Sequence, residues 1–158
     1  MKKLFLLAVA LVAAHAIARA QEPKMEGAWK IDRARNEATA RAAGPGRAGG
    51  PPANTLGVKL STADVTIDSD TGSNRMVETF KYVLDGKEHL QPGPLSWTTM
   101  AKSVWEGSKL VVNIKRTIEG PSGPITIEMK DVYSVEGDAL VIERTQGRDL
   151  WKTYYTRA

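Results

Sequence analysis

Short runs rich in β-branched and aromatic residues follow one another from Asn54 to the end of the chain, and apolar and polar positions alternate within them. Such runs are typical of β-strands. Turn residues separate them at regular intervals, as at Asp85-Gly86 and Glu136-Gly137-Asp138. The pattern predicts ten strands, near residues 26–33, 56–60, 63–69, 75–84, 87–90, 96–105, 109–118, 124–135, 139–145 and 150–157.

Links this short join neighbouring antiparallel strands, because parallel strands need long crossover connections. A series of antiparallel strands keeps two exposed edges unless the sheet closes on itself. We therefore predict an all-β fold, an up-and-down antiparallel barrel of about 8–10 strands. The alternative is a two-sheet sandwich, which normally needs longer Greek-key connections than this sequence offers.

Residues 33–53, between the first two predicted strands, have a different composition, dominated by Ala, Arg, Gly and Pro. Residues 36–43 contain good helix formers but no apolar stripe, so a helix there needs something to pack on. The Gly- and Pro-rich residues 44–52 favour a loop. We expect a short helix or a flexible loop after the first strand.

The first twenty residues have the features of a cleavable signal peptide. A basic start at Lys2 and Lys3 is followed by an apolar run and by Ala18-Arg19-Ala20, the small-x-small pattern that signal peptidase cleaves. The run is shorter than the about 20 apolar residues that span a bilayer, and no Cys follows it for lipid attachment. We expect residues 21–158 to be exported to the periplasm or the medium as one soluble domain without stable membrane insertion. An uncleaved anchor is the alternative.

Charge and cysteine content exclude several classes of function. The chain has 22 Lys and Arg against 18 Asp and Glu, and three basic residues lie in the predicted leader, so the mature net charge is about +1. Such a balance gives no support to nucleic-acid binding. The absence of cysteine excludes thiol catalysis, cysteine-based zinc sites and disulfides. We expect a monomer stabilised by packing.

The two ends of the predicted barrel carry a family resemblance. Gly27-Ala28-Trp29 opens the first strand, and the aromatic-rich last strand ends at Arg157. With the intervening strands, this chain resembles the calycin superfamily of lipocalins and fatty-acid-binding proteins. It is most similar to a group of small secreted bacterial lipocalin-like proteins of largely unassigned function. The resemblance implies structural roles for Trp29, across the closed end of the barrel, and for Arg157, stacked over it by a cation–π contact.

Alternation of side chains also predicts which strand faces point inward. Four charged residues fall on otherwise apolar faces, where a charge needs a partner or a hydrated cavity. One interpretation is a ligand-binding interior, in which Arg116 and Arg144 hold a polar or anionic head group. The candidate ligand-binding residues are Glu78, Tyr82, Trp97, Trp105, Arg116, Asp131, Tyr133 and Arg144. The alternatives are a shift of register by a β-bulge, or an internal ion pair of Glu78 or Asp131 with an Arg.

No catalytic constellation is apparent. His89 is the only histidine after the predicted leader, so a histidine-based metal cluster cannot form, and a surface position for it is expected. The sequence has no Gly-x-Ser-x-Gly elbow, phosphate loop or dinucleotide fingerprint. We expect neither a metal nor a cofactor, and a binding protein for a small apolar or amphipathic ligand. The alternative is a filled barrel that acts as a protein–protein interaction module of the cell envelope, and an enzyme ranks last.

Overall fold

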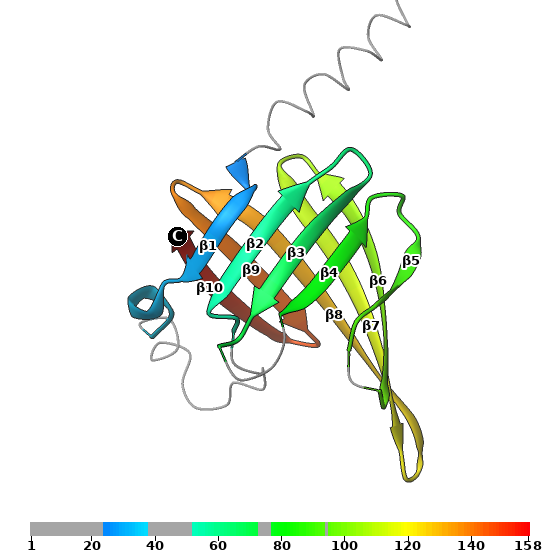
Figure 1. Cartoon of the computed structure of the whole chain (residues 1–158). Coiled ribbons are helices and arrows are strands. Elements are labelled where there is room, and N and C mark those ends of the chain that lie inside the picture. Colours follow the sequence, from blue (N-terminus) through cyan, green and yellow to red (C-terminus); the bar gives the residue numbers. More distant parts are fainter. Residues whose placement is uncertain (1–23, 38–51, 73–76, 94) are drawn as a thin grey trace, which may run out of the picture.

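A computed structural model describes residues 24–37, 52–72, 77–93 and 95–158 of the chain (Figure 1). It contains ten antiparallel strands in one sheet, which confirms the predicted all-β barrel. The strands are β1 Gly27–Ile31, β2 Thr55–Leu60, β3 Asp64–Asp70, β4 Glu78–Val83, β5 Glu88–Gln91, β6 Trp97–Glu106, β7 Lys109–Gly120, β8 Gly123–Glu136, β9 Ala139–Gln146 and β10 Asp149–Arg157. The predicted signal peptide and residues 38–51 of the predicted loop lie outside the described residues.

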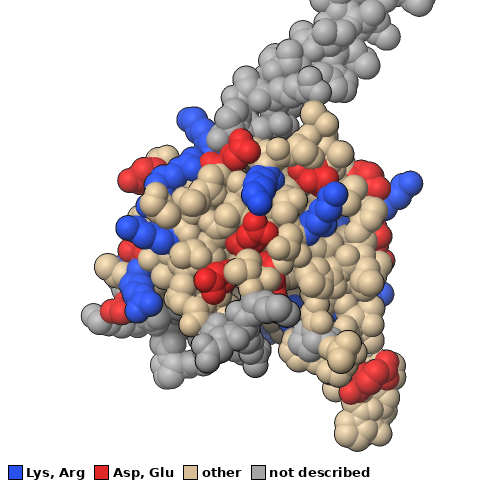
Figure 2. Space-filling model, viewed as in Figure 1, with Lys and Arg blue, Asp and Glu red and all other residues tan. Residues whose placement is uncertain are grey.

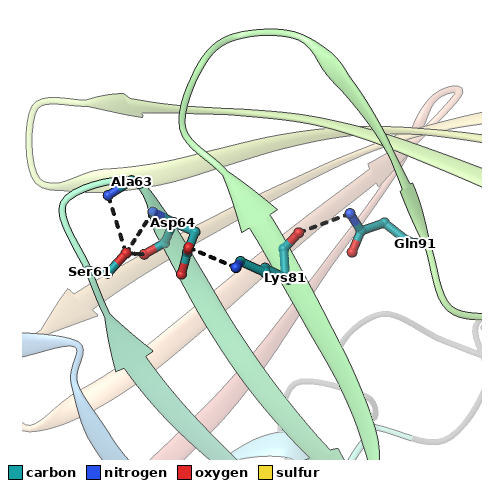
Figure 3. A network of polar contacts seen from close by, with 5 residues as sticks. All are labelled: Ser61, Ala63, Asp64, Lys81 and Gln91. Atoms are coloured by element: carbon teal, nitrogen blue, oxygen red, sulfur yellow. Dashed lines mark hydrogen bonds and ion pairs between the residues drawn. The ribbon is translucent and has the colours of Figure 1, made fainter.

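Pairing of the first strand with the last strand closes most of the barrel. The strand order is β4-β3-β2-β1-β10-β9-β8-β7-β6-β5, and Trp29 of β1 lies opposite Arg157 of β10. The two edge strands are β4 and β5. Across this gap the side-chain Nε2 of Gln91 donates a hydrogen bond of 3.1 Å to the carbonyl oxygen of Lys81 (Figure 3). The barrel is therefore nearly closed, with one side-chain bridge where the sheet is interrupted.

A short helix after β1 begins at residue 33 and continues to residue 37, the last described residue before the gap. Its start is capped by Asp32, whose Oδ1 accepts a hydrogen bond of 3.0 Å from the Arg35 backbone N–H. The buried Asn36 ties this turn to β10, because its amide donates to Tyr154 O and its Oδ1 accepts from Tyr154 N. This segment is therefore docked onto the barrel wall.

The outer wall formed by β1 to β4 carries mixed charges. Figure 2 shows Lys and Arg interspersed with Asp and Glu over this face. Lys59 pairs with Asp68 at 3.1 Å and Lys81 pairs with Asp64 at 3.2 Å across neighbouring strands (Figure 3). The charges on this face are thus balanced locally. Among the described residues, no helix has the length and apolar character needed to cross a membrane.

The barrel has two unlike ends. At one end, apolar side chains of β1, β7 and β9 pack into a solid core that includes Trp29, Leu110 and Leu140, all fully buried. At the other end, the β7–β8 hairpin extends beyond the rest of the barrel (Figure 1). There the neighbouring positions Trp97, Ile118 and Ile125 share one face, and Ile125 is 58% exposed. The interior between these ends holds the candidate site.

Candidate ligand-binding cavity

The barrel encloses a cavity of about 520 Å³. This volume lies within the range of about 300–1,000 Å³ that is usual for small-molecule sites. Much of its wall is apolar, and the apolar lining includes Leu56, Ile67, Phe80, Ile114, Ile142 and Tyr155. The cavity weighs against the filled barrel, the alternative considered from the sequence.

The cavity reaches the end of the barrel opposite Trp29. Its lining includes Pro52 and Thr71, which flank the start of β2 and the end of β3, together with Glu78 at the start of β4. In antiparallel strands these positions fall at one end of the sheet. We call this end the mouth; the β7–β8 hairpin projects from the same end (Figure 1).

Arg144 and Asp131 form an ion pair in the cavity wall. They lie opposite each other on β9 and β8, and Arg144 donates from Nε to Oδ1 at 2.7 Å and from Nη2 to Oδ2 at 2.5 Å. Asp131 is fully buried, whereas the Arg144 side chain keeps 43% of its surface exposed. The hydrogen bonds to Asp131 raise the pKa of Arg144. The pair uses the Arg144 charge internally, as one alternative for these charged positions required.

Arg116 differs from Arg144 because it forms no ion pair with any carboxylate among the described residues. Its Nε donates a long hydrogen bond of 3.4 Å to Thr99 Oγ1, and its guanidinium carbon lies 4.9 Å from the centre of the Trp97 ring. Burial, followed by repulsion from Arg144, lowers the pKa of Arg116, but a guanidinium still stays protonated at neutral pH. Arg116 thus supplies a positive charge to the cavity.

Tyr82 and Tyr133 form a buried aromatic pair beside these arginines. Their ring centres lie 6.2 Å apart with the planes tilted by 50°, and Phe80 stacks against Tyr82 at the same separation. Burial raises the pKa of Tyr82 to about 12 and raises that of Tyr133 well above its usual value. Both hydroxyls therefore stay protonated at neutral pH and can hydrogen-bond to a ligand.

Five of the candidate residues line the cavity together, namely Glu78, Tyr82, Arg116, Tyr133 and Arg144, and Asp131 lies behind Arg144. The structure does not place Trp97 or Trp105 in the wall. Trp97 begins β6 beyond the cavity, where it is 36% exposed, and Trp105 lies opposite Leu110 and packs on the core near the solid end. Alternation assigns a residue to a face, but it does not say how far along the barrel that residue lies.

Sequence reasoning also missed part of the wall. Trp151, Thr153 and Tyr155 share the inward face of β10, and the alternation of that strand could have indicated them. Gln91 gave no such signal, because the predicted strand ended one residue earlier, at Leu90. Thr99 lies on the same face of β6 as Ala101, and both line the cavity.

The solid end has the arrangement that the family resemblance implies for Trp29 and Arg157. The Arg157 guanidinium lies 3.9 Å from the centre of the buried Trp29 ring, and its donors reach the carbonyl oxygens of Glu26 and Lys24. The indole Nε1 donates to Met25 O at 2.9 Å. Gly27 has a φ of 127°, and a Cβ there would run into the Arg157 guanidinium. Every strong donor of this pair is therefore satisfied within the protein.

His89 lies at the surface, where its Nε2 is 2.9 Å from Asp85 Oδ1. In the parts of the chain that the structure describes, no group of three or more His, Cys, Asp or Glu residues is placed to hold a metal ion. The polar groups of the cavity are instead suited to hydrogen bonding and charge pairing.

Fold and cavity together define a calycin-type barrel, which confirms the sequence resemblance at the level of the fold. Among solved structures, a secretory abundant heat soluble protein from Ramazzottius varieornatus is similar, with a TM-score of 0.56 and 17% identity over 85% of this chain and 96% of that one. The fluorescent protein UnaG gives a TM-score of 0.55 and 21% identity over 85% of this chain and 98% of that one. No protein-family model and no curated protein sequence matches the chain.

Proposed function

We propose that this protein is an exported binding protein, without catalytic activity, that holds a small amphipathic ligand inside its barrel. The observation that carries the proposal is the cavity itself, which combines apolar walls with one unpaired cation, Arg116, among the described residues. A buried apolar surface supplies affinity, and a few fixed polar groups orient the ligand. An anionic or strongly polar head group near Arg116 suits this combination.

The position of Arg116 supports a defined orientation of the ligand. Arg116 lies on β7 between Ile114, which is buried, and Ile118, which belongs to the projecting hairpin. A ligand with its head group at Arg116 can bury its apolar part against Ile114, Phe80 and Ile142. Arg144 contributes less charge to such binding than the sequence suggested, because Asp131 neutralises it.

Ligand binding is tested first on protein purified from its native source. Native mass spectrometry is expected to show a bound small molecule, and the mass of the free chain is expected to correspond to a start at Gln21. Protein that carries no small molecule, and whose unfolding temperature does not change with any member of a lipid and metabolite panel, would contradict the proposal.

A cavity-filling variant supplies a sharper test. Ala101→Phe places a ring in the cavity, and Lys102→Phe places the same ring on the outward face of the next position. We expect Ala101→Phe to abolish binding of anilinonaphthalene sulfonate, measured by fluorescence, with a stability loss below the ~1–3 kcal/mol of an overpacked core. Lys102→Phe should bind the dye like the original protein. Equal dye binding by both variants would show that the dye does not occupy the barrel.

A further inference from the structure

A row of three polar residues crosses three neighbouring strands in the cavity wall. Gln91 of β5 lies opposite Thr99 of β6, and Thr99 lies opposite Arg116 of β7. All three line the cavity. The next position in this row, Ile127 of β8, is apolar. The polar groups are thus confined to the part of the wall beside the β4–β5 gap.

Gln91 has an unused acceptor in this row. Its amide nitrogen is occupied, because Nε2 donates to Lys81 O at 3.1 Å across the gap (Figure 3). That bond fixes which end of the amide faces β4. The other end, Oε1, is buried and has no hydrogen-bond partner among the described residues, and the residue as a whole is only 7% exposed. A buried carbonyl without a donor is unfavourable, so a ligand that supplies an N–H or O–H gains binding energy there.

Arg116 faces the same space from the other side of Thr99. Its Nε lies 3.4 Å from Thr99 Oγ1, so the side chain leans across β6 toward Gln91. Hydrogen-bonded neighbouring strands are about 4.8 Å apart, which leaves roughly one strand spacing between the guanidinium and the Gln91 amide. One small head group can span this distance. Thr99, with a hydroxyl that can both accept and donate, lies between the two.

We infer that the cavity binds an amphiphile whose head group carries an anion together with an adjacent N–H or O–H donor, rather than a simple carboxylate. The anion pairs with Arg116 and the donor bonds to Gln91 Oε1. N-acyl amino acids and hydroxy acids have this chemistry. The inference rests on the proposed function and specifies its ligand class.

A matched pair of probes isolates the donor. N-dodecanoylglycine has a carboxylate and an amide N–H, N-dodecanoylsarcosine replaces that N–H by N-methyl, and dodecanoate has the carboxylate alone. Binding is measured by calorimetry below the micelle concentration. We expect N-dodecanoylglycine to bind more tightly than either of the other probes, by about fivefold or more, since loss of the N–H leaves Gln91 Oε1 unpaired.

Two variants assign the effect to the residues. Gln91→Met should reduce the preference for the glycine derivative over the sarcosine derivative to about one, whereas Arg116→Met should weaken both by the same factor and keep the preference. A merely structural role of Gln91 would change both affinities and leave their ratio unaltered. That unaltered ratio overturns the inference, and so does equal binding of the two probes by the original protein.

A measurement on the unaltered protein covers the case in which Gln91→Met does not fold. The amide N–H of bound N-dodecanoylglycine, followed by NMR, should exchange with solvent more slowly than that of the free probe. Exchange at the free rate while the probe is bound overturns the inference and leaves the proposed function standing. Failure of all three probes to bind counts against both.

Discussion

The two ends of the barrel each carry an arginine stacked on a tryptophan, and the two pairs are built differently. Arg157 lies 3.9 Å from the ring centre of Trp29, and Arg116 lies 4.9 Å from that of Trp97. Trp29 is fully buried, whereas Trp97 is 36% exposed. Arg157 donates to two backbone carbonyls, whereas the one hydrogen bond found for Arg116 is the long one to Thr99.

This comparison shows that a cation–π contact alone does not define a role. At the solid end, burial of the indole and saturation of the guanidinium donors fix the ends of the chain to each other through β1 and β10. At the mouth, the exposed ring contributes little to burial, and the guanidinium keeps free donors that face the cavity. The first pair should therefore determine stability, and the second should determine binding.

Truncation of the two tryptophans should give the largest difference between the ends. Trp29→Ala removes a fully buried aromatic side chain and should lower the free energy of unfolding by ~3–5 kcal/mol. Trp97→Ala removes a side chain at the surface and should lower it by less than ~1 kcal/mol. Urea denaturation followed by circular dichroism measures both. Similar losses for the two variants would show that the mouth contributes to the core after all.

The Arg144–Asp131 pair should give the next largest effect. Arg144→Met leaves the fully buried Asp131 carboxylate without its partner, which should lower the free energy of unfolding by about 3 kcal/mol. Asp131→Asn should cost less, because Arg144 is 43% exposed and water can solvate its charge. The asymmetry is measured by denaturation of both variants. The opposite order would indicate that Arg144, rather than Asp131, is the residue shielded from water.

The difference between the ends also marks the limit of what the sequence could predict. Strands and their inward faces follow from alternation, so Glu78, Tyr82 and Tyr133 were assigned to the interior correctly as far as face is concerned. Depth along the barrel and partnership across strands depend on register, which a single sequence does not contain. For this reason Trp105 was assigned to the ligand and Arg144 was expected to be free.

Alkaline pH should weaken the barrel through its buried tyrosines. Burial raises the pKa of Tyr82 and of Tyr155 to about 12, whereas in the unfolded chain both lie near 10. Between these values the unfolded state releases protons that the folded state keeps, so stability falls as pH rises, by about 1.4 kcal/mol per pH unit for each tyrosine. Denaturation midpoints from pH 9 to 11 test the direction, and Tyr82→Phe should make the fall shallower. A midpoint that does not move over this range would contradict the burial of these hydroxyls.

Arg116→Met should have the smallest effect on stability, because no carboxylate among the described residues pairs with Arg116 and its removal leaves no buried charge alone. We expect a change within about 0.5 kcal/mol in the free energy of unfolding. Binding of dodecanoate should nevertheless weaken at least tenfold, which corresponds to ~1.4 kcal/mol and to the loss of a charge-assisted contact. Arg157→Met is the matched control, since it removes the same group from the solid end. It should reduce stability while leaving the dodecanoate affinity of the folded fraction unchanged, and a reversal of the two outcomes would mean that the roles of the two ends have been assigned the wrong way round.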